Sequence, residues 1–235
     1  MAARQPHDRI LAGGRRVRQL DFRSSAGQVE GVLFCRVDGR PPAVAVFCHP
    51  HPQHGGSMHN KVAYRASEAV FERGLPTLRF NFRGVGRSAG VWGGGDGEEE
   101  DATAAITFLE RMYPGLPVLL GGFSFGGGIA LALGARDARV AAVLAVAPAV
   151  GARDLAPLAA SPKPKGVVQG TADELCPLPA LQASYAAWAE PKAARLVAGA
   201  GHFFDGRLPQ LRAAVQDLLD EPAMAAALRL GREDS

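Results

Sequence analysis

The chain has 235 residues, of which 47% are hydrophobic and 21% are charged, with a formal net charge of +3 at pH 7. This length and composition are typical of one globular domain and exclude disordered and fibrous proteins. The basic residues are scattered, which argues against a nucleic-acid surface. The longest apolar run, residues 141–150, is about half as long as a membrane-spanning helix.

The predicted elements begin with two strands, residues 17–22 and 29–37, which we expect to form an antiparallel hairpin at one edge of a sheet. Short apolar runs then predict further strands at 43–48, 77–82, 118–123, 140–147, 165–169 and 194–198. Helical spacing predicts helices between them at 60–73, 98–113, 125–136, 177–189 and 208–219. This alternation predicts an α/β domain with a mostly parallel sheet of about eight strands and helices on both faces.

No linker divides this pattern, so we expect one domain over residues 14–220. Residues 1–13 are expected to be a flexible segment, and residues 221–235 a tail with room for a short helix. Residues 1–18 contain no apolar segment typical of a signal peptide. The three cysteines are too few and too irregular for a disulfide framework. We therefore expect a cytoplasmic protein with no membrane or nucleic-acid partner.

A glycine-flanked serine lies where a predicted strand meets a predicted helix. Residues 122–126, Gly-Phe-Ser-Phe-Gly, have the G-x-S-x-G pattern. A strand, a sharp turn and a helix around this pattern are typical of a nucleophile elbow, whose glycines allow close backbone approach. The turn would lift the Ser124 hydroxyl above the carboxyl edge of the sheet. A glycine-rich nucleotide-binding turn is the alternative, although no phosphate-loop motif accompanies it.

A serine hydroxyl needs a base to accept its proton. His202 follows the last predicted strand, and Asp173 follows the strand 165–169, so both should lie at the same sheet edge as Ser124. We predict His202 to be the base and Asp173 the acid that orients it. Asp173 could instead cap a helix, and Glu174 and Asp154 are the other candidates for the acid.

The chain order Ser, Asp, His is that of the α/β-hydrolases. The chain resembles that superfamily, and more narrowly a group of small bacterial hydrolases related to dienelactone hydrolase-like and acyl-peptidase-like enzymes. The resemblance covers residues from about 30 to 220 and lies in the segments CHPHPQHGGSMHNK, FNFRGVGRS, GGFSFGG, GTADELCP and GAGHFFDG. It implies an α/β-hydrolase fold and a hydrolase that uses no metal and no organic cofactor. It implies no particular substrate.

The sequence departs from the wider superfamily in its oxyanion loop. His49-Pro50-His51-Pro52 stands where a glycine-rich loop is usual. Proline has no amide hydrogen, so only His49, His51 and Gln53 can donate there. We expect the backbone amides of His51 and Phe125 to hold the oxyanion.

The chain also departs from the superfamily in size. Residues 151–165, after the strand 140–147, form a short proline-rich connection that has no room for a helical cap. We therefore expect no large cap domain. The pocket should be shallow and open, or closed by a second copy of the chain in a homodimer.

Two clusters of polar residues leave alternatives open. Four histidines between His49 and His59 suggest a zinc site, but the alternating prolines should turn their side chains apart, and we expect the loop to position backbone amides instead. Arg83 and Arg87 could meet an anionic substrate or be paired within the protein.

These features predict a serine hydrolase that cleaves a carboxylic ester, thioester or amide of a small-molecule acyl substrate through an acyl-enzyme on Ser124. An acyltransferase with the same three residues is one alternative. A non-catalytic ligand-binding protein on this fold is another, and a metallohydrolase is the third.

Overall fold

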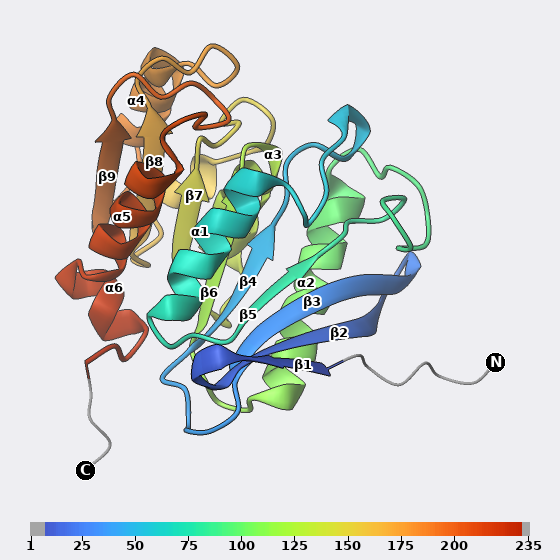
Figure 1. The fold of residues 1–235 in the computed structure, drawn as a ribbon. Coiled ribbons are helices and arrows are strands. Elements are labelled where there is room, and N and C mark those ends of the chain that lie inside the picture. Colours follow the sequence, from blue (N-terminus) through green and yellow to red (C-terminus); the bar gives the residue numbers. More distant parts are fainter. Residues whose placement is uncertain (1–7, 232–235) are drawn as a thin grey trace.

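Residues 8–231, the part of the chain that the computed structural model describes, form one twisted sheet with helices on both faces (Figure 1). The nine strands among these residues lie in the order β1-β2-β3-β5-β4-β6-β7-β8-β9. In chain order they are β1 (Asp8–Leu11), β2 (Arg15–Ser24), β3 (Gly27–Arg36), β4 (Val44–Cys48), β5 (Thr77–Phe80), β6 (Val118–Phe123), β7 (Val140–Val146), β8 (Lys165–Gly170) and β9 (Lys192–Val197). Pairs from β5 through β4 to β9 are parallel, and β1, β2 and β3 join them by antiparallel pairs. The predicted mostly parallel sheet is confirmed.

Helices α1 and α5 cover one face of the sheet, and α2 and α3 cover the other (Figure 1). The central strands β4, β6, β7 and β8 supply apolar side chains to both layers because successive side chains point to opposite faces. In β4, for example, Val44 and Val46 pack with α2 and α3, whereas Ala45 and Phe47 pack with α1 and α5. The helices are α1 (Lys61–Glu72), α2 (Asp96–Met112), α3 (Phe125–Arg136), α4 (Leu178–Ala186), α5 (Leu208–Leu219) and α6 (Pro222–Ala227).

The N-terminal region differs from the prediction. We expected residues 1–13 to be flexible, but Asp8–Leu11 form β1, which pairs with β2 outside the predicted hairpin. All four side chains are exposed, so the strand depends on its backbone pairing and on the carboxylate of Asp8, which pairs with Arg16 and Arg18. Residues 1–7 lie outside the described part of the chain.

No large cap follows β7. Between β7 and β8 the chain forms only the short 3₁₀ helix η3 (Ala156–Ala159), as predicted from the length of this connection. The carboxyl ends of β6, β8 and β9 therefore remain uncovered by any inserted domain. Within residues 8–231, no helix has both the length and the apolar character to cross a membrane.

Candidate functional site

Ser124 occupies a strained turn between β6 and α3. Its backbone has φ 56° and ψ −117°, a conformation that a residue with a β-carbon rarely adopts. Hydrogen bonds hold the turn in place: the Ser124 amide donates to the Val146 carbonyl at 2.9 Å, and the Ser124 carbonyl accepts from the amides of Gly128 and Ala149, each at 3.0 Å. The structure thus contains the predicted elbow between β6 and α3.

The flanking glycines are required by close backbone contacts. A β-carbon on Gly122 would lie 2.1 Å from the carbonyl oxygen of Gly126. A β-carbon on Gly126 would lie 2.4 Å from the carbonyl oxygen of His49. The second contact also shows that the loop after β4 packs directly against the first turn of α3. Both glycines of the G-x-S-x-G pattern therefore have a steric reason.

The side chains of Ser124, His202 and Asp173 meet at the carboxyl edge of the sheet. The Nε2 atom of His202 lies 3.0 Å from the Oγ atom of Ser124, and its Nδ1 atom lies 2.9 Å from Oδ2 of Asp173. An ionised carboxylate can only accept, so Nδ1 carries a proton and Nε2 is free to accept the serine proton. His202 and Asp173 are buried, and each follows a different parallel strand, as predicted.

The Asp173 carboxylate also stabilises the loop that carries it. Its Oδ1 atom accepts from the amides of Leu175 at 3.0 Å and Cys176 at 2.8 Å, which fixes the turn before α4. Burial alone would raise the pKa of this carboxyl, but the hydrogen bonds from His202, the Cys176 amide and Gln169 outweigh burial and lower that pKa. The capping interpretation and the orienting interpretation are thus compatible, because each uses a different carboxylate oxygen.

The other candidates for the acid lie elsewhere. Asp154 is exposed, and its carboxylate accepts from the Ala156 amide at 3.0 Å. Glu174 follows Asp173 in the chain but is exposed. Among the described residues, only Asp173 makes a carboxylate contact with His202.

Gln169, at the end of β8, is a member of this site that the sequence did not reveal. It is fully buried, and its Nε2 atom donates to Oδ2 of Asp173 at 3.0 Å and to the carbonyl of Cys176 at 2.9 Å. The only signal in the sequence was one amide side chain that follows two valines at the end of the predicted strand 165–169. Gln169 holds the carboxylate that in turn holds His202.

The Cys176 thiol lies beside the Ser124 hydroxyl. Burial, followed by the nearby Asp173 carboxylate, raises the pKa of this thiol to about 11. At neutral pH the group is therefore a neutral thiol and a poor nucleophile.

The loop after β4 is held by His49. Its Nε2 atom accepts from the Phe82 amide at 3.0 Å, and its Nδ1 atom lies 2.6 Å from the Pro50 carbonyl, to which it donates. Both ring nitrogens are therefore engaged by the backbone, which leaves neither for a metal ion. Within the described part of the chain, no group of three or more His, Cys, Asp or Glu side chains is arranged to hold a metal ion.

Asn60, at the end of the same loop, caps α1: its side-chain oxygen accepts from the amides of Val62 and Ala63.

Burial makes His49 a source of acid sensitivity. Burial lowers its pKa from 6.5 to about 4. Between these pH values the unfolded chain binds a proton at His49 that the folded protein does not bind. The free energy of unfolding therefore has its full value above pH 6.5 and falls as the pH drops toward 4. We expect this residue to reduce the free energy of unfolding by about 2 kcal/mol at pH 5 relative to pH 7.

Urea unfolding of the wild type and of His49→Gln at the two pH values measures this effect. The variant should lose less stability on acidification, because it has no imidazole to protonate. An equal loss in both proteins would contradict the assignment.

The two amides predicted to hold an oxyanion belong to segments that touch. The ring centroids of His51 and Phe125 are 5.0 Å apart, and the backbone of residues 48–49 packs on Gly126. Phe125 is the first residue of α3, so its amide is one of those that a helix leaves without an intrahelical partner. The donor role of the two amides stays a prediction.

Arg83 and Arg87 are both paired within the protein. The guanidinium of Arg83 donates to the fully buried Asp101 through Nε at 3.1 Å and Nη2 at 2.9 Å. Arg87 donates from its amide and from Nε to the carboxylate of Glu30, at 2.7 and 2.8 Å. These arginines hold the loop after β5. Pairing within the protein, the second of the two predicted roles, therefore accounts for both of them.

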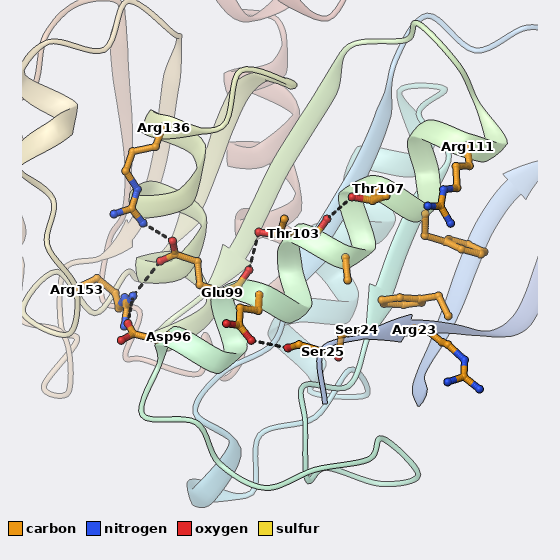
Figure 2. A pocket seen from close by; sticks show the side chains of 14 residues that line it. Arg23, Ser24, Ser25, Asp96, Glu99, Thr103, Thr107, Arg111, Arg136 and Arg153 are labelled. Carbon is orange, nitrogen blue, oxygen red and sulfur yellow. Dashed lines mark hydrogen bonds and ion pairs between the residues drawn. The ribbon is translucent and has the colours of Figure 1, made fainter. Parts of the chain in front are cut away.

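A cavity of about 760 Å³ lies away from Ser124, His202 and Asp173, over the outer face of α2. Figure 2 shows Arg136 and Arg153 turned toward Glu99 and Asp96 at one end of it. Neither Ser124 nor its two partners line this cavity. The predicted acyl chemistry therefore has no connection with it.

Comparison with known proteins identifies the family. The model of the family described as serine aminopeptidase S33 matches residues 40–177, more than half of the chain. A serine hydrolase homologue from Coxiella burnetii superposes with a TM-score of 0.80 at 36% identity, over 86% of this chain and 96% of that one. The chain belongs to the α/β-hydrolase superfamily.

Two further proteins are similar to this chain. A Xanthomonas campestris protein, described as an α/β serine hydrolase without lid, has a TM-score of 0.79 and 32% identity over 86% of this chain and 93% of that one. An uncharacterized protein of Rickettsia prowazekii (strain Madrid E) is 32% identical over 210 residues, which cover 86% of this hydrolase and 88% of the relative. The first of these relatives is similar in lacking a lid, which matches the short connection after β7.

Proposed function

We propose that this hydrolase is a serine esterase that cleaves carboxylic esters through an acyl-enzyme on Ser124. One observation carries the proposal: His202 bridges the other two groups, with Nε2 3.0 Å from the serine hydroxyl and Nδ1 2.9 Å from the Asp173 carboxylate. A base in this position, oriented by an ionised acid, is what a serine needs to become a nucleophile. The strained backbone conformation of Ser124 and the backbone hydrogen bonds that hold it further support the proposal.

The first half of the reaction acylates the enzyme. The Oγ atom of Ser124 attacks the ester carbonyl as its proton passes to Nε2 of His202, and the carbonyl oxygen becomes an oxyanion. The amides of Phe125 and His51 donate to that oxyanion, and each such donor typically contributes about 3 kcal/mol to transition-state stabilisation. The intermediate then collapses, the bond to the leaving oxygen breaks, and His202 gives its proton to the leaving alcohol.

The second half releases the acid. Water attacks the acyl carbon while His202 accepts a proton from it, and the new tetrahedral intermediate is held by the same amides. The bond to Oγ breaks, His202 returns the proton to Ser124, and the carboxylic acid leaves. Throughout, Asp173 stays ionised, which agrees with the hydrogen bonds that lower its pKa.

Esters are proposed in preference to amides because an alkoxide leaving group needs less assistance than an amine. The absence of a large cap also leaves the site open to water, the second substrate of a hydrolase. An acyltransferase would have to exclude water in favour of an alcohol or amine acceptor.

Hydrolysis of p-nitrophenyl acetate in the presence of added glycerol tests this function. We expect acetate as the main product by mass spectrometry, and an unchanged rate after treatment with EDTA. Glyceryl acetate as the main product would favour an acyltransferase, and loss of activity with EDTA would favour a metallohydrolase. Absence of any turnover would favour a ligand-binding protein.

A further inference from the structure

An aromatic cluster lies beside the nucleophile. It consists of the rings of His51, Trp92 and Phe125, which come from three separate segments of the chain. The Trp92 ring is 4.6 Å from that of His51 at an interplanar angle of 29°, and 5.3 Å from that of Phe125. Phe125 directly follows Ser124, so the cluster adjoins the point of attack.

The cluster is anchored on one side and open on the other. Phe125 is buried and contacts the Phe82 ring at 6.0 Å, whereas Trp92 and His51 are half-buried. The neighbouring Val91 is 79% exposed. The rings of Trp92 and His51 are therefore partly exposed to solvent, and the third ring of the cluster belongs to the residue that follows the reacting serine.

The segment that carries Trp92 is fixed before any substrate arrives. The Glu98 carboxylate accepts from the amides of Gly93 at 3.0 Å and Gly95 at 2.8 Å, which ties the glycine-rich loop to the start of α2. These bonds also explain why α2 begins at Asp96, two residues before the predicted start. A preformed surface loses little entropy on binding a ligand.

The direction of proton transfer determines whether the acyl group or the leaving group of an ester faces the aromatic cluster. His202 must protonate the leaving oxygen, so the leaving group lies on the His202 side of Ser124. On that side Phe203 and Leu175, the neighbours of His202 and Cys176, are 42% and 66% exposed. The carbonyl oxygen faces the amides of His51 and Phe125, and the acyl chain is bonded to the same carbon and extends away from the leaving group. The acyl chain is then within reach of the rings of those two residues and of Trp92, which stacks on His51.

We propose that the aromatic cluster binds the acyl group, and that the preferred substrates are esters of acids with an aromatic ring near the carbonyl. This inference rests on the proposed esterase function and names its substrate class. A ring stacked on Trp92 gains an aromatic contact that a saturated ring of similar size does not. By the usual strength of such contacts, the preference should be about 3- to 10-fold in kcat/KM.

Two matched esters test the proposal: p-nitrophenyl phenylacetate and p-nitrophenyl cyclohexylacetate, which share a leaving group. The measured quantity is the ratio of their kcat/KM values, each divided by the rate of hydrolysis by hydroxide. We expect a ratio of about 3 to 10 in the wild type. It should fall to about 1 in Trp92→Leu, and Trp92→Phe should retain most of it because a ring remains. Val91→Ala, on the same loop, is the control and should keep both the ratio and the activity.

The outcomes of these measurements distinguish failure of the acyl-site proposal from failure of the proposed esterase function. Hydrolysis of p-nitrophenyl acetate with a wild-type ratio near 1, or with a raised ratio that survives Trp92→Leu, overturns the acyl-site proposal and leaves the esterase intact. A ratio lost in Phe203→Leu rather than in Trp92→Leu also overturns it, because the ring would then lie on the leaving-group side. Failure to cleave even the acetate refutes the esterase function itself.

Discussion

Ser124→Ala should lower kcat for p-nitrophenyl acetate by at least about 10⁴-fold, because removing the nucleophile of a serine hydrolase leaves only the oxyanion donors and substrate binding. Its melting temperature should change by no more than about 3 °C, since a small, half-buried serine contributes little packing. The hydroxyl contacts His202, but the turn itself is held by backbone hydrogen bonds that alanine retains. Steady-state kinetics and thermal unfolding of the purified variant measure the two effects.

The neighbouring Cys176 cannot replace the lost hydroxyl at neutral pH, because the pKa of its thiol is about 11. Ser25→Ala is a suitable control: Ser25 bonds to Glu100 at a distant surface, and its loss should leave kcat unchanged. Activity of Ser124→Ala within tenfold of the wild type would show that another group is the nucleophile.

Asp173→Asn should lower kcat by about 10³- to 10⁴-fold with a small effect on KM. The side-chain oxygen of asparagine can still accept from the amides of Leu175 and Cys176, so the turn before α4 should survive. Its amide nitrogen, however, would donate toward Nδ1 of His202 and favour the tautomer whose Nε2 carries a proton. That tautomer cannot accept the proton of Ser124.

The pH dependence of kcat and the melting temperature separate a loss of orientation from a loss of fold. Glu174→Gln and Asp154→Asn are the matched controls, because both remove an exposed carboxylate that the sequence offered as the acid. If one of them lost as much activity as Asp173→Asn, the assignment of the acid would be wrong.

The sequence predicted the three central side chains because each lies in the turn or loop that follows the carboxyl end of a predicted strand. Parallel strands bring their carboxyl ends to one edge, so the order of strands and loops was enough to place Ser124, Asp173 and His202 together. The flanking glycines pointed to the strained turn for the same local reason. None of these inferences required knowledge of a contact between distant residues.

What the sequence could not predict depends on long-range partners. Strand β1 has no buried side chain, so no apolar alternation marks it, and its existence follows from pairing with β2. Arg87 reaches Glu30 and Arg83 reaches Asp101 only in the folded chain. The role of Gln169 could not be predicted because it depends on the contact with the Asp173 carboxylate in the folded chain. The stacking of Trp92 on His51 likewise joins two loops that no local pattern connects.

The acyl-enzyme itself provides the most direct test. Acid-quenching the wild type during turnover of p-nitrophenyl acetate, followed by peptide mass spectrometry, should find one acetyl group on the peptide that contains residues 122–126, at Ser124. An acetyl group on any other side chain, or a reaction that proceeds with no acylated protein under conditions where acylation outpaces hydrolysis, would contradict covalent catalysis by this serine.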